Sequence, residues 1–244
     1  MKRRYVILAL TFGSVTIAGG STAVLRLHKT PRRNPYLTDE HLRAIAQPLG
    51  QTLRVLFIGN SMVMNHDVPS LVVKEAAKDG TTLTTATAAA HGIRLVETVR
   101  VDALMDMLKQ QHWDAVVVQD FTKTPLRVTD RLGSAYAIGR IQRAMPTTPV
   151  VLYPPFPARR GHSVYRNAGT LTVTPRDPAD YAERTMRHYA DIADRHGLHV
   201  APVPARWLSE GRPDFYARDG HHPSPAGAQF IADVLWSTLK DVLL

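Results

Sequence analysis

The sequence contains no cysteine among its 244 residues. This absence excludes disulfide bonds, a cysteine nucleophile, thiolate metal ligands and a lipid-modified N-terminal cysteine. It does not indicate a compartment, because cysteine-free chains occur in both oxidising and reducing surroundings. The sequence also shows no internal repeat. Its hydrophobic content of 44% is enough for a single sizeable core behind an N-terminal leader.

Acidic residues are scarce at the start of the chain, and this locates most of the formal charge of +9. Residues 1–50 hold eight lysines and arginines against two carboxylates, a net charge of +6, which leaves +3 for residues 51–244. The positive charge therefore flanks the leader and forms no stripe across the folded part. We expect no nucleic acid partner.

An uncharged stretch, residues 5–25, follows the basic residues at the N-terminus. It is long enough to cross a bilayer, its apolar half alone fits the core of a signal peptide, and Ser21-Thr22-Ala23 resembles a cleavage site. Positive charge on both flanks leaves the orientation undecided. We therefore expect an exported protein. Residues 1–28 are a signal peptide or a retained membrane anchor, 29–50 a linker and 51–244 one domain.

Short apolar runs alternate with helical stretches through this domain. The runs predict strands at 55–58, 83–86, 115–119, 150–153 and 199–203, and the helical stretches cover 70–79, 95–110, 130–144, 178–196 and 225–243. Strands separated by helices pair in parallel through right-handed crossovers. We expect an α/β fold with a doubly wound parallel sheet of about five strands.

The predicted helix 178–196 carries acid–base pairs four residues apart, which indicates a solvated face: Asp180/Arg184, Glu183/Arg187 and Asp191/Arg195. His188 is interpreted as a surface residue of the same helix.

A serine follows the first apolar run, at the turn Gly59-Asn60-Ser61. In open α/β sheets ligands bind at the carboxyl ends of the strands, so Ser61 is a candidate nucleophile. A candidate base lies in Asp219-Gly220-His221-His222, just before the last helix. A carboxylate three residues ahead of an imidazole can accept from Nδ1–H and so leave Nε2 free to take a proton from serine.

These two segments, Gly59-Asn60-Ser61 and Asp219-Gly220-His221-His222-Pro223-Ser224, resemble the first and last blocks of the SGNH hydrolase (GDSL-like esterase/lipase) superfamily. The resemblance covers residues 54–243 and implies a three-layer α/β/α, flavodoxin-like fold. It also implies that Ser61 is the nucleophile, His222 the general base and Asp219 the carboxylate that orients it. If His221 points toward Ser61 in place of His222, His221 takes the role of the general base.

The two middle blocks match less closely. Gly92, after the second predicted strand, matches the glycine whose amide joins the oxyanion hole in the family. The third block has Gln119 where the family has an asparagine, as in a divergent branch that also has an Asn-x-x-Pro-like segment after the serine, here Asn65-His66-Asp67-Val68-Pro69. Losing an oxyanion donor costs on the order of 100-fold in rate. If Gln119 does not donate a hydrogen bond to the oxyanion, we expect the protein to be weakly active or inactive.

The resemblance implies a serine esterase that works by acyl transfer and needs no metal or organic cofactor. We expect a small-molecule or saccharide ester as substrate, with short O-acyl groups such as acetate. Two alternatives stay open: a lipid or lysophospholipid esterase, and a non-catalytic envelope protein that keeps the fold and binds a partner. The oligomeric state is not indicated.

Three further histidines, His66, His91 and His162, lie near predicted strand ends but lack the spacing of a metal motif. The long segment 154–178 either shapes the substrate site or is a surface insertion.

Overall fold

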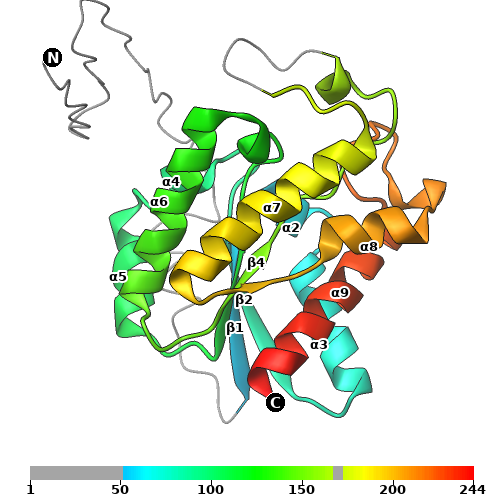
Figure 1. Ribbon diagram of the computed structural model, residues 1–244. Coiled ribbons are helices and arrows are strands. Elements are labelled where there is room, and N and C mark those ends of the chain that lie inside the picture. Colours follow the sequence, from blue (N-terminus) through cyan, green and yellow to red (C-terminus); the bar gives the residue numbers. More distant parts are fainter. Residues whose placement is uncertain (1–51, 167–172) are drawn as a thin grey trace, which may run out of the picture. The chain divides into compact units, whose positions relative to one another are not determined.

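Five parallel strands form the centre of the structure, a computed structural model that describes residues 52–166 and 173–244 (Figure 1). The strands are β1 (Leu53–Gly59), β2 (Leu83–Ala89), β3 (Ala115–Gln119), β4 (Val150–Tyr153) and β5 (His199–Val200). Their order in the sheet is β2-β1-β3-β4-β5, and every neighbouring pair is parallel. The predicted parallel α/β sheet is confirmed.

Helices cover both faces of this sheet, which gives the three layers (Figure 1). One face is covered by α3 (Val68–Lys78), α8 (Val203–Glu210) and α9 (Pro225–Leu243). The other is covered by α4 (Leu95–Thr98), α5 (Asp102–Gln110), α6 (Val128–Ala144) and α7 (Pro178–His196). A short helix α2 (Ser61–Met64) follows β1. The described part of the chain also contains the 3₁₀ turns η2 (Thr124–Leu126), η3 (Ser163–Tyr165) and η4 (Pro213–Phe215).

Strand β1 is buried on both faces because it lies inside the sheet. Val55 and Phe57 belong to the core beneath α3 and α9, while Leu56 and Ile58 belong to the core beneath α5, α6 and α7. All four side chains are inaccessible to solvent. A strand that is apolar on both sides is typical of a parallel sheet covered by helices, and it fixes the position of the turn that follows.

Two predicted elements differ from the structure. The strand expected over 199–203 ends at Val200, because α8 begins at Val203 and Pro202 cannot donate a ladder hydrogen bond. The helix expected over 95–110 is divided into α4 and α5 around the β-branched residues Val99 and Val101, which are weaker helix formers.

Two polar residues of α7 are buried where the charge pattern predicted a solvated face. Asp180 is 5% exposed and accepts hydrogen bonds from the Arg176 amide at 2.9 Å and from Arg184 Nε at 3.0 Å. His188 is 6% exposed, and this burial lowers its pKa to about 4. The Glu183–Arg187 pair is exposed as expected. Spacing identified the partners but not the side of the helix that packs.

The predicted leader (1–28) and linker (29–50) lie outside the described residues, and the domain boundaries stay a prediction. Within the described ranges, no helix combines the length and the hydropathy needed to span a bilayer.

The first turn of α9 packs closely on the segment before it. Ser224 caps the helix by accepting from the Gly227 amide at 3.1 Å. A methyl group at Gly227 would lie 2.1 Å from the carbonyl oxygen of Phe215 and 2.8 Å from Trp207 Cη2. Glycine is therefore required here by close contact with backbone, and this contact fixes the start of α9.

We expect Gly227→Ala to lower the free energy of unfolding by roughly 1–3 kcal/mol or more, because the added methyl group overpacks this contact. Urea denaturation followed by tryptophan fluorescence measures the change. Gly133→Ala on α6 is the matched control: its methyl group would lie 3.5 Å from Val96, an ordinary contact, so stability should stay unchanged or rise by up to about 1 kcal/mol. Equal stability of the two variants would contradict the close packing.

Candidate active site

The serine turn is fixed by Gly59 and Asn60 at the carboxyl end of β1. A methyl group at Gly59 would lie 2.6 Å from Val63 Cγ2, so any larger residue here would force the turn or Val63 to shift. Asn60 is 2% exposed, and its Oδ1 accepts from the Met62 amide at 3.1 Å, which caps α2. Ser61 is then the first residue of α2 and stays partly accessible.

His222 reaches this serine from the other end of the domain. Its Nε2 lies 3.0 Å from Ser61 Oγ, although 161 residues separate the two in sequence. Its Nδ1 lies 2.6 Å from Asp219 Oδ2. A carboxylate can only accept, so Nδ1 carries the proton and Nε2 is left as an acceptor for the serine hydroxyl. Of the two adjacent histidines, His222 is the one directed at Ser61.

Asp219 is held as an anion by the turn that it caps. Partial burial alone would raise its pKa, but hydrogen bonds from the His222 ring and from the amides of His221 and His222 outweigh this and hold the pKa of Asp219 well below its ordinary range. Both amides donate to Oδ1 at 2.9 Å. The carboxylate of Asp219 is therefore ionised at neutral pH.

The turn itself is closed by backbone contacts. The Ala217 amide donates to the carbonyl of His222 at 2.9 Å, and Tyr216 pairs with Pro223 in an antiparallel bridge. Gly220 has a φ of +69°, a left-handed conformation that favours glycine. The Arg159 amide donates to the carbonyl of Gly220 at 2.7 Å, which joins the turn to the segment after β4.

His221 points away from Ser61, toward that same segment. Its ring stacks on His162 with the centroids 5.5 Å apart, and its Nε2 lies 3.5 Å from Thr122 Oγ1. Burial, together with the neighbouring His222 and His162, lowers the pKa of His221 to about 4. At neutral pH this histidine is therefore an uncharged, polar side chain beside the candidate base.

Gly92 lies in a loop that is tied to the serine turn. Asn60 Nδ2 donates to the carbonyl of Ile93 at 3.4 Å, and the Ala90 amide donates to the carbonyl of Gly59 at 3.3 Å. Gly92 has a φ of +67°, and a methyl group at this position would lie within 4 Å of no described residue other than its chain neighbours. Glycine is therefore favoured here by the left-handed backbone conformation and not by close packing. The space beside its α-carbon is open.

Gln119 lies beneath the serine turn and is 1% exposed. Its Oε1 accepts from the Asn60 amide at 3.2 Å, and its Nε2 donates to the carbonyl of Asp120. In this position Gln119 braces the turn, and one of its two amide hydrogens is already bound. Its role as a third oxyanion donor stays a prediction.

Asp120 is a site residue that sequence reasoning missed. It is 2% exposed, and burial raises its pKa, opposed by hydrogen bonds from the amides of Leu95 and Phe121 at 2.8 and 2.6 Å. It thereby holds the start of α4, just after Gly92, against the end of β3. Its position directly after a buried strand was the only available signal.

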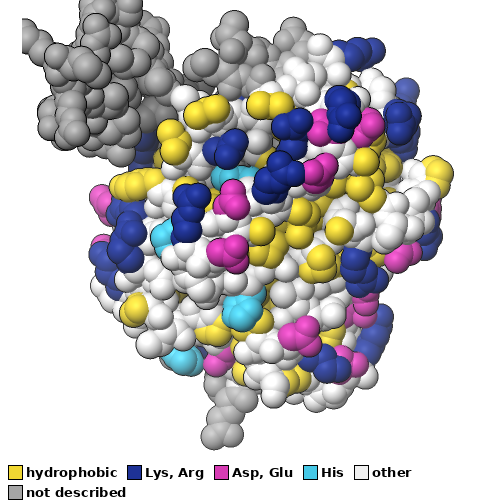
Figure 2. All heavy atoms as spheres, in the orientation of Figure 1, with side chains coloured by type: hydrophobic (Ala, Val, Ile, Leu, Met, Phe, Trp, Pro, Cys, Tyr) yellow, Lys and Arg dark blue, Asp and Glu magenta, His cyan; other side chains and the backbone are white. Residues whose placement is uncertain are grey.

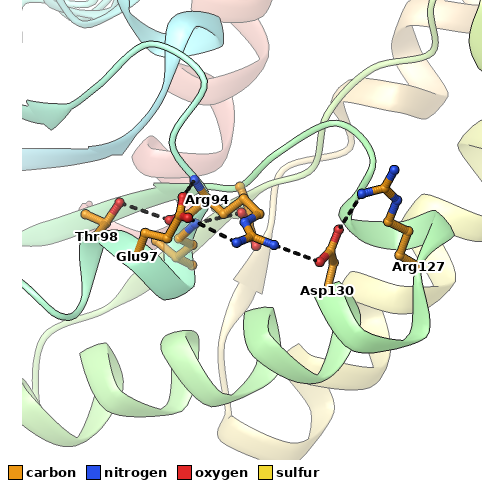
Figure 3. A network of polar contacts seen from close by, with 7 residues as sticks. Arg94, Glu97, Thr98, Arg127 and Asp130 are labelled. Atoms are coloured by element: carbon orange, nitrogen blue, oxygen red, sulfur yellow. Dashed lines mark hydrogen bonds and ion pairs between the residues drawn. The ribbon is translucent and has the colours of Figure 1, made fainter. Parts of the chain in front are cut away.

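An ion-pair network fixes the outer side of the same loop (Figure 3). Arg94 contacts Glu97 at 3.0 Å and Asp130 at 3.2 Å, and so joins α4 to α6. Arg127 lies 3.8 Å from the other oxygen of Asp130. The loop that carries Gly92 is therefore held from both ends.

The other histidines named from the sequence are not brought together. His66 and His91 are exposed, and His162 stacks on His221. Among residues 52–166 and 173–244, no three histidine, aspartate or glutamate side chains are grouped so as to hold a metal ion. The catalytic roles of the five candidate residues stay predictions, to which the structure adds distances and partners. These residues are Ser61, His222, Asp219, Gly92 and Gln119.

Solved structures resemble this chain closely in fold. A protein from Slackia heliotrinireducens assigned to the SGNH hydrolases is 26% identical, covers 78% of this chain and all of its own length, and has a TM-score of 0.66. The lipase/acylhydrolase from Enterococcus faecalis is 15% identical over 78% of this chain and 96% of its own, with a TM-score of 0.60. The psychrotrophic esterase EstA from Pseudoalteromonas is 14% identical over 78% of this chain and 98% of its own length, with a TM-score of 0.55.

At 15% and 14% identity the likeness shows the fold alone. Neither a family model nor a curated protein matches the sequence. The structure from Slackia and the parallel three-layer fold nevertheless agree with the resemblance seen in the sequence, and the chain belongs to the SGNH hydrolase superfamily.

Proposed function

We propose that this hydrolase is a carboxylic ester hydrolase that uses Ser61, His222 and Asp219 as a catalytic triad. The observation that carries the proposal is the pair of contacts on His222, with Ser61 Oγ 3.0 Å from Nε2 and Asp219 Oδ2 2.6 Å from Nδ1. These contacts supply a base for the serine and a fixed tautomer for the base.

In the first half of the reaction, Ser61 Oγ attacks the ester carbonyl carbon as His222 Nε2 takes the hydroxyl proton. The oxyanion accepts hydrogen bonds from the amides of Ser61 and Gly92. The Ser61 amide suits this role because the first N–H groups of a helix have no partner within it. The protonated His222, stabilised by Asp219, then gives its proton to the leaving alcohol.

In the second half, water loses a proton to His222 and attacks the acyl-enzyme carbonyl, and the collapse of the second oxyanion returns the proton to Ser61. The free acid leaves and the triad is restored.

We propose short O-acyl esters, such as acetylated saccharides, as the substrate. The ring of His221 lies next to that of His222, and His221 in turn stacks on His162 and contacts Thr122 Oγ1. Neutral imidazoles near the candidate base can exchange hydrogen bonds with sugar hydroxyls. Export into a carbohydrate-rich envelope, which the N-terminal sequence favours, supplies such substrates. Mass spectrometry of the mature N-terminus tests the export: a start near Val24 means a cleaved signal, Met1 in the membrane fraction means an anchor, and Met1 in the cytosol contradicts both.

Ser61→Ala and His222→Ala should each lower the turnover of p-nitrophenyl acetate on the order of 1,000-fold or more, because each removes the nucleophile or its base. His112→Ala is the control, since His112 is exposed and lies outside the site. Thermal unfolding confirms that the variants fold. Equal rates in all of them would favour a non-catalytic binding protein.

The chain-length profile of the wild-type rate separates the substrate classes. A rate that falls steadily from acetate to palmitate supports a deacylase of short acyl groups. A rate that is highest for long acyl chains would contradict the deacylase and support a lipid esterase.

Gln119→Ala should lower kcat on the order of 100-fold and leave KM nearly unchanged if the second amide hydrogen of Gln119 reaches the oxyanion, because such a contact forms only in the transition state. Steady-state kinetics with p-nitrophenyl acetate measures both constants. An unchanged kcat would remove Gln119 from the oxyanion hole and leave it as a brace for Asn60.

A further inference from the structure

An apolar stripe runs along the open side of α6. Val128, Leu132 and Tyr136 are 53%, 62% and 45% exposed and follow one another at four-residue intervals, so they lie along one side of the helix. They make up half of the six large hydrophobic side chains that are exposed among the described residues. We refer to these three residues as the α6 stripe.

The charged side chains that α6 itself carries are mainly positive. Residues 127–144 contain four arginines, at positions 127, 131, 140 and 143, and a single carboxylate. That carboxylate, Asp130, has a side chain only 8% exposed and is taken up by ion pairs with Arg94 and Arg127 (Figure 3). Figure 2 shows hydrophobic side chains and Lys or Arg side chains side by side over the upper part of α6.

The α6 stripe begins at the sheet edge that carries the candidate active site. The short connection from the end of β3 to the start of α6 contains only the 3₁₀ turn η2. Thr122, in this connection, contacts His221. Val173, 41% exposed, donates its amide to the carbonyl of Leu126 at 2.8 Å and so adds a further apolar side chain near this end of the helix.

A second copy of the chain is a poor occupant for this surface. A stable protein interface uses about 20–30 residues on each side, whereas the α6 stripe is three side chains on one helix. Self-association would also bring the arginines of two copies together. An anionic lipid surface has the opposite properties: its headgroups complement the arginines, and its interfacial layer accepts Val, Leu and Tyr side chains.

We propose that α6 docks on an anionic lipid surface through the α6 stripe and its flanking arginines, with the edge of the sheet that carries Ser61 next to the membrane. This surface is separate from the proposed esterase chemistry. It would orient the domain on the envelope membrane whether or not residues 5–25 remain attached.

The absence of cysteine makes a direct test possible on the full chain. Leu132→Cys, labelled with a polarity-sensitive fluorophore, is mixed with vesicles of phosphatidylcholine alone or with about one-third phosphatidylglycerol. We expect a blue shift and a gain in intensity with the anionic vesicles and little change with the neutral ones. Ala77→Cys is the matched control, because Ala77 is exposed on α3, across the sheet from α6. Its label should not respond, even where the N-terminal segment attaches the chain to the vesicle.

Reversing two of the charges, with Arg131→Glu and Arg143→Glu in the labelled chain, should weaken the response to anionic vesicles on the order of 10-fold or more. The rate on p-nitrophenyl acetate should not change, which separates a failure of docking from a failure of the proposed function. Equal responses at positions 132 and 77, or equal responses to both vesicle types, would overturn the proposal. A shift that grows with protein concentration without lipid would also overturn it in favour of a second copy.

Discussion

The contact between Ser61 and His222 is the interaction on which the rest of the site depends. It joins the turn after the first strand to the turn before the last helix, across 161 residues. Each partner is placed by a close-packed glycine next to its own element, Gly59 against Val63 and Gly227 against Phe215. The backbone at neither residue can move far without displacing the end of a buried strand or the start of α9. The sheet therefore acts as the rigid support that a preorganised site requires.

Beneath this contact lies a small set of buried polar groups. Asn60, Gln119 and Asp120 are each no more than 2% exposed, and together they bind the serine turn and the loop after Gly92 through amides and carbonyls. Buried polar groups are stable only when they are hydrogen-bonded, so this arrangement has few alternatives. It explains how glutamine is accommodated at the third block: its longer side chain reaches the Asn60 amide and accepts from it.

The sequence predicted most of the fold and the candidate triad, for identifiable reasons. The strands were found because buried parallel strands are continuous apolar runs, and the triad because Gly59-Asn60-Ser61 and the Asp219–His222 segment are local in sequence. The features that the sequence did not predict depend on how the elements pack. The burial of His188 and Asp180 is decided by which side of α7 meets the sheet, and the bracing role of Asp120 by a contact with α4, 25 residues away. Periodicity reveals neither, and the position of Asp120 after a buried strand does not identify its partner.

The candidate site and the start of the α6 stripe lie at the same edge of the sheet, and we propose that this places polar-ester chemistry beside a membrane. The central claim is that His222 makes Ser61 nucleophilic. Treating the protein with diethyl p-nitrophenyl phosphate and measuring the intact mass tests this most directly. We predict one diethylphosphoryl adduct, located on Ser61 by peptide mapping, at a rate that falls sharply in His222→Ala and Asp219→Asn. No adduct, an adduct elsewhere, or an equal rate in His222→Ala would contradict the account.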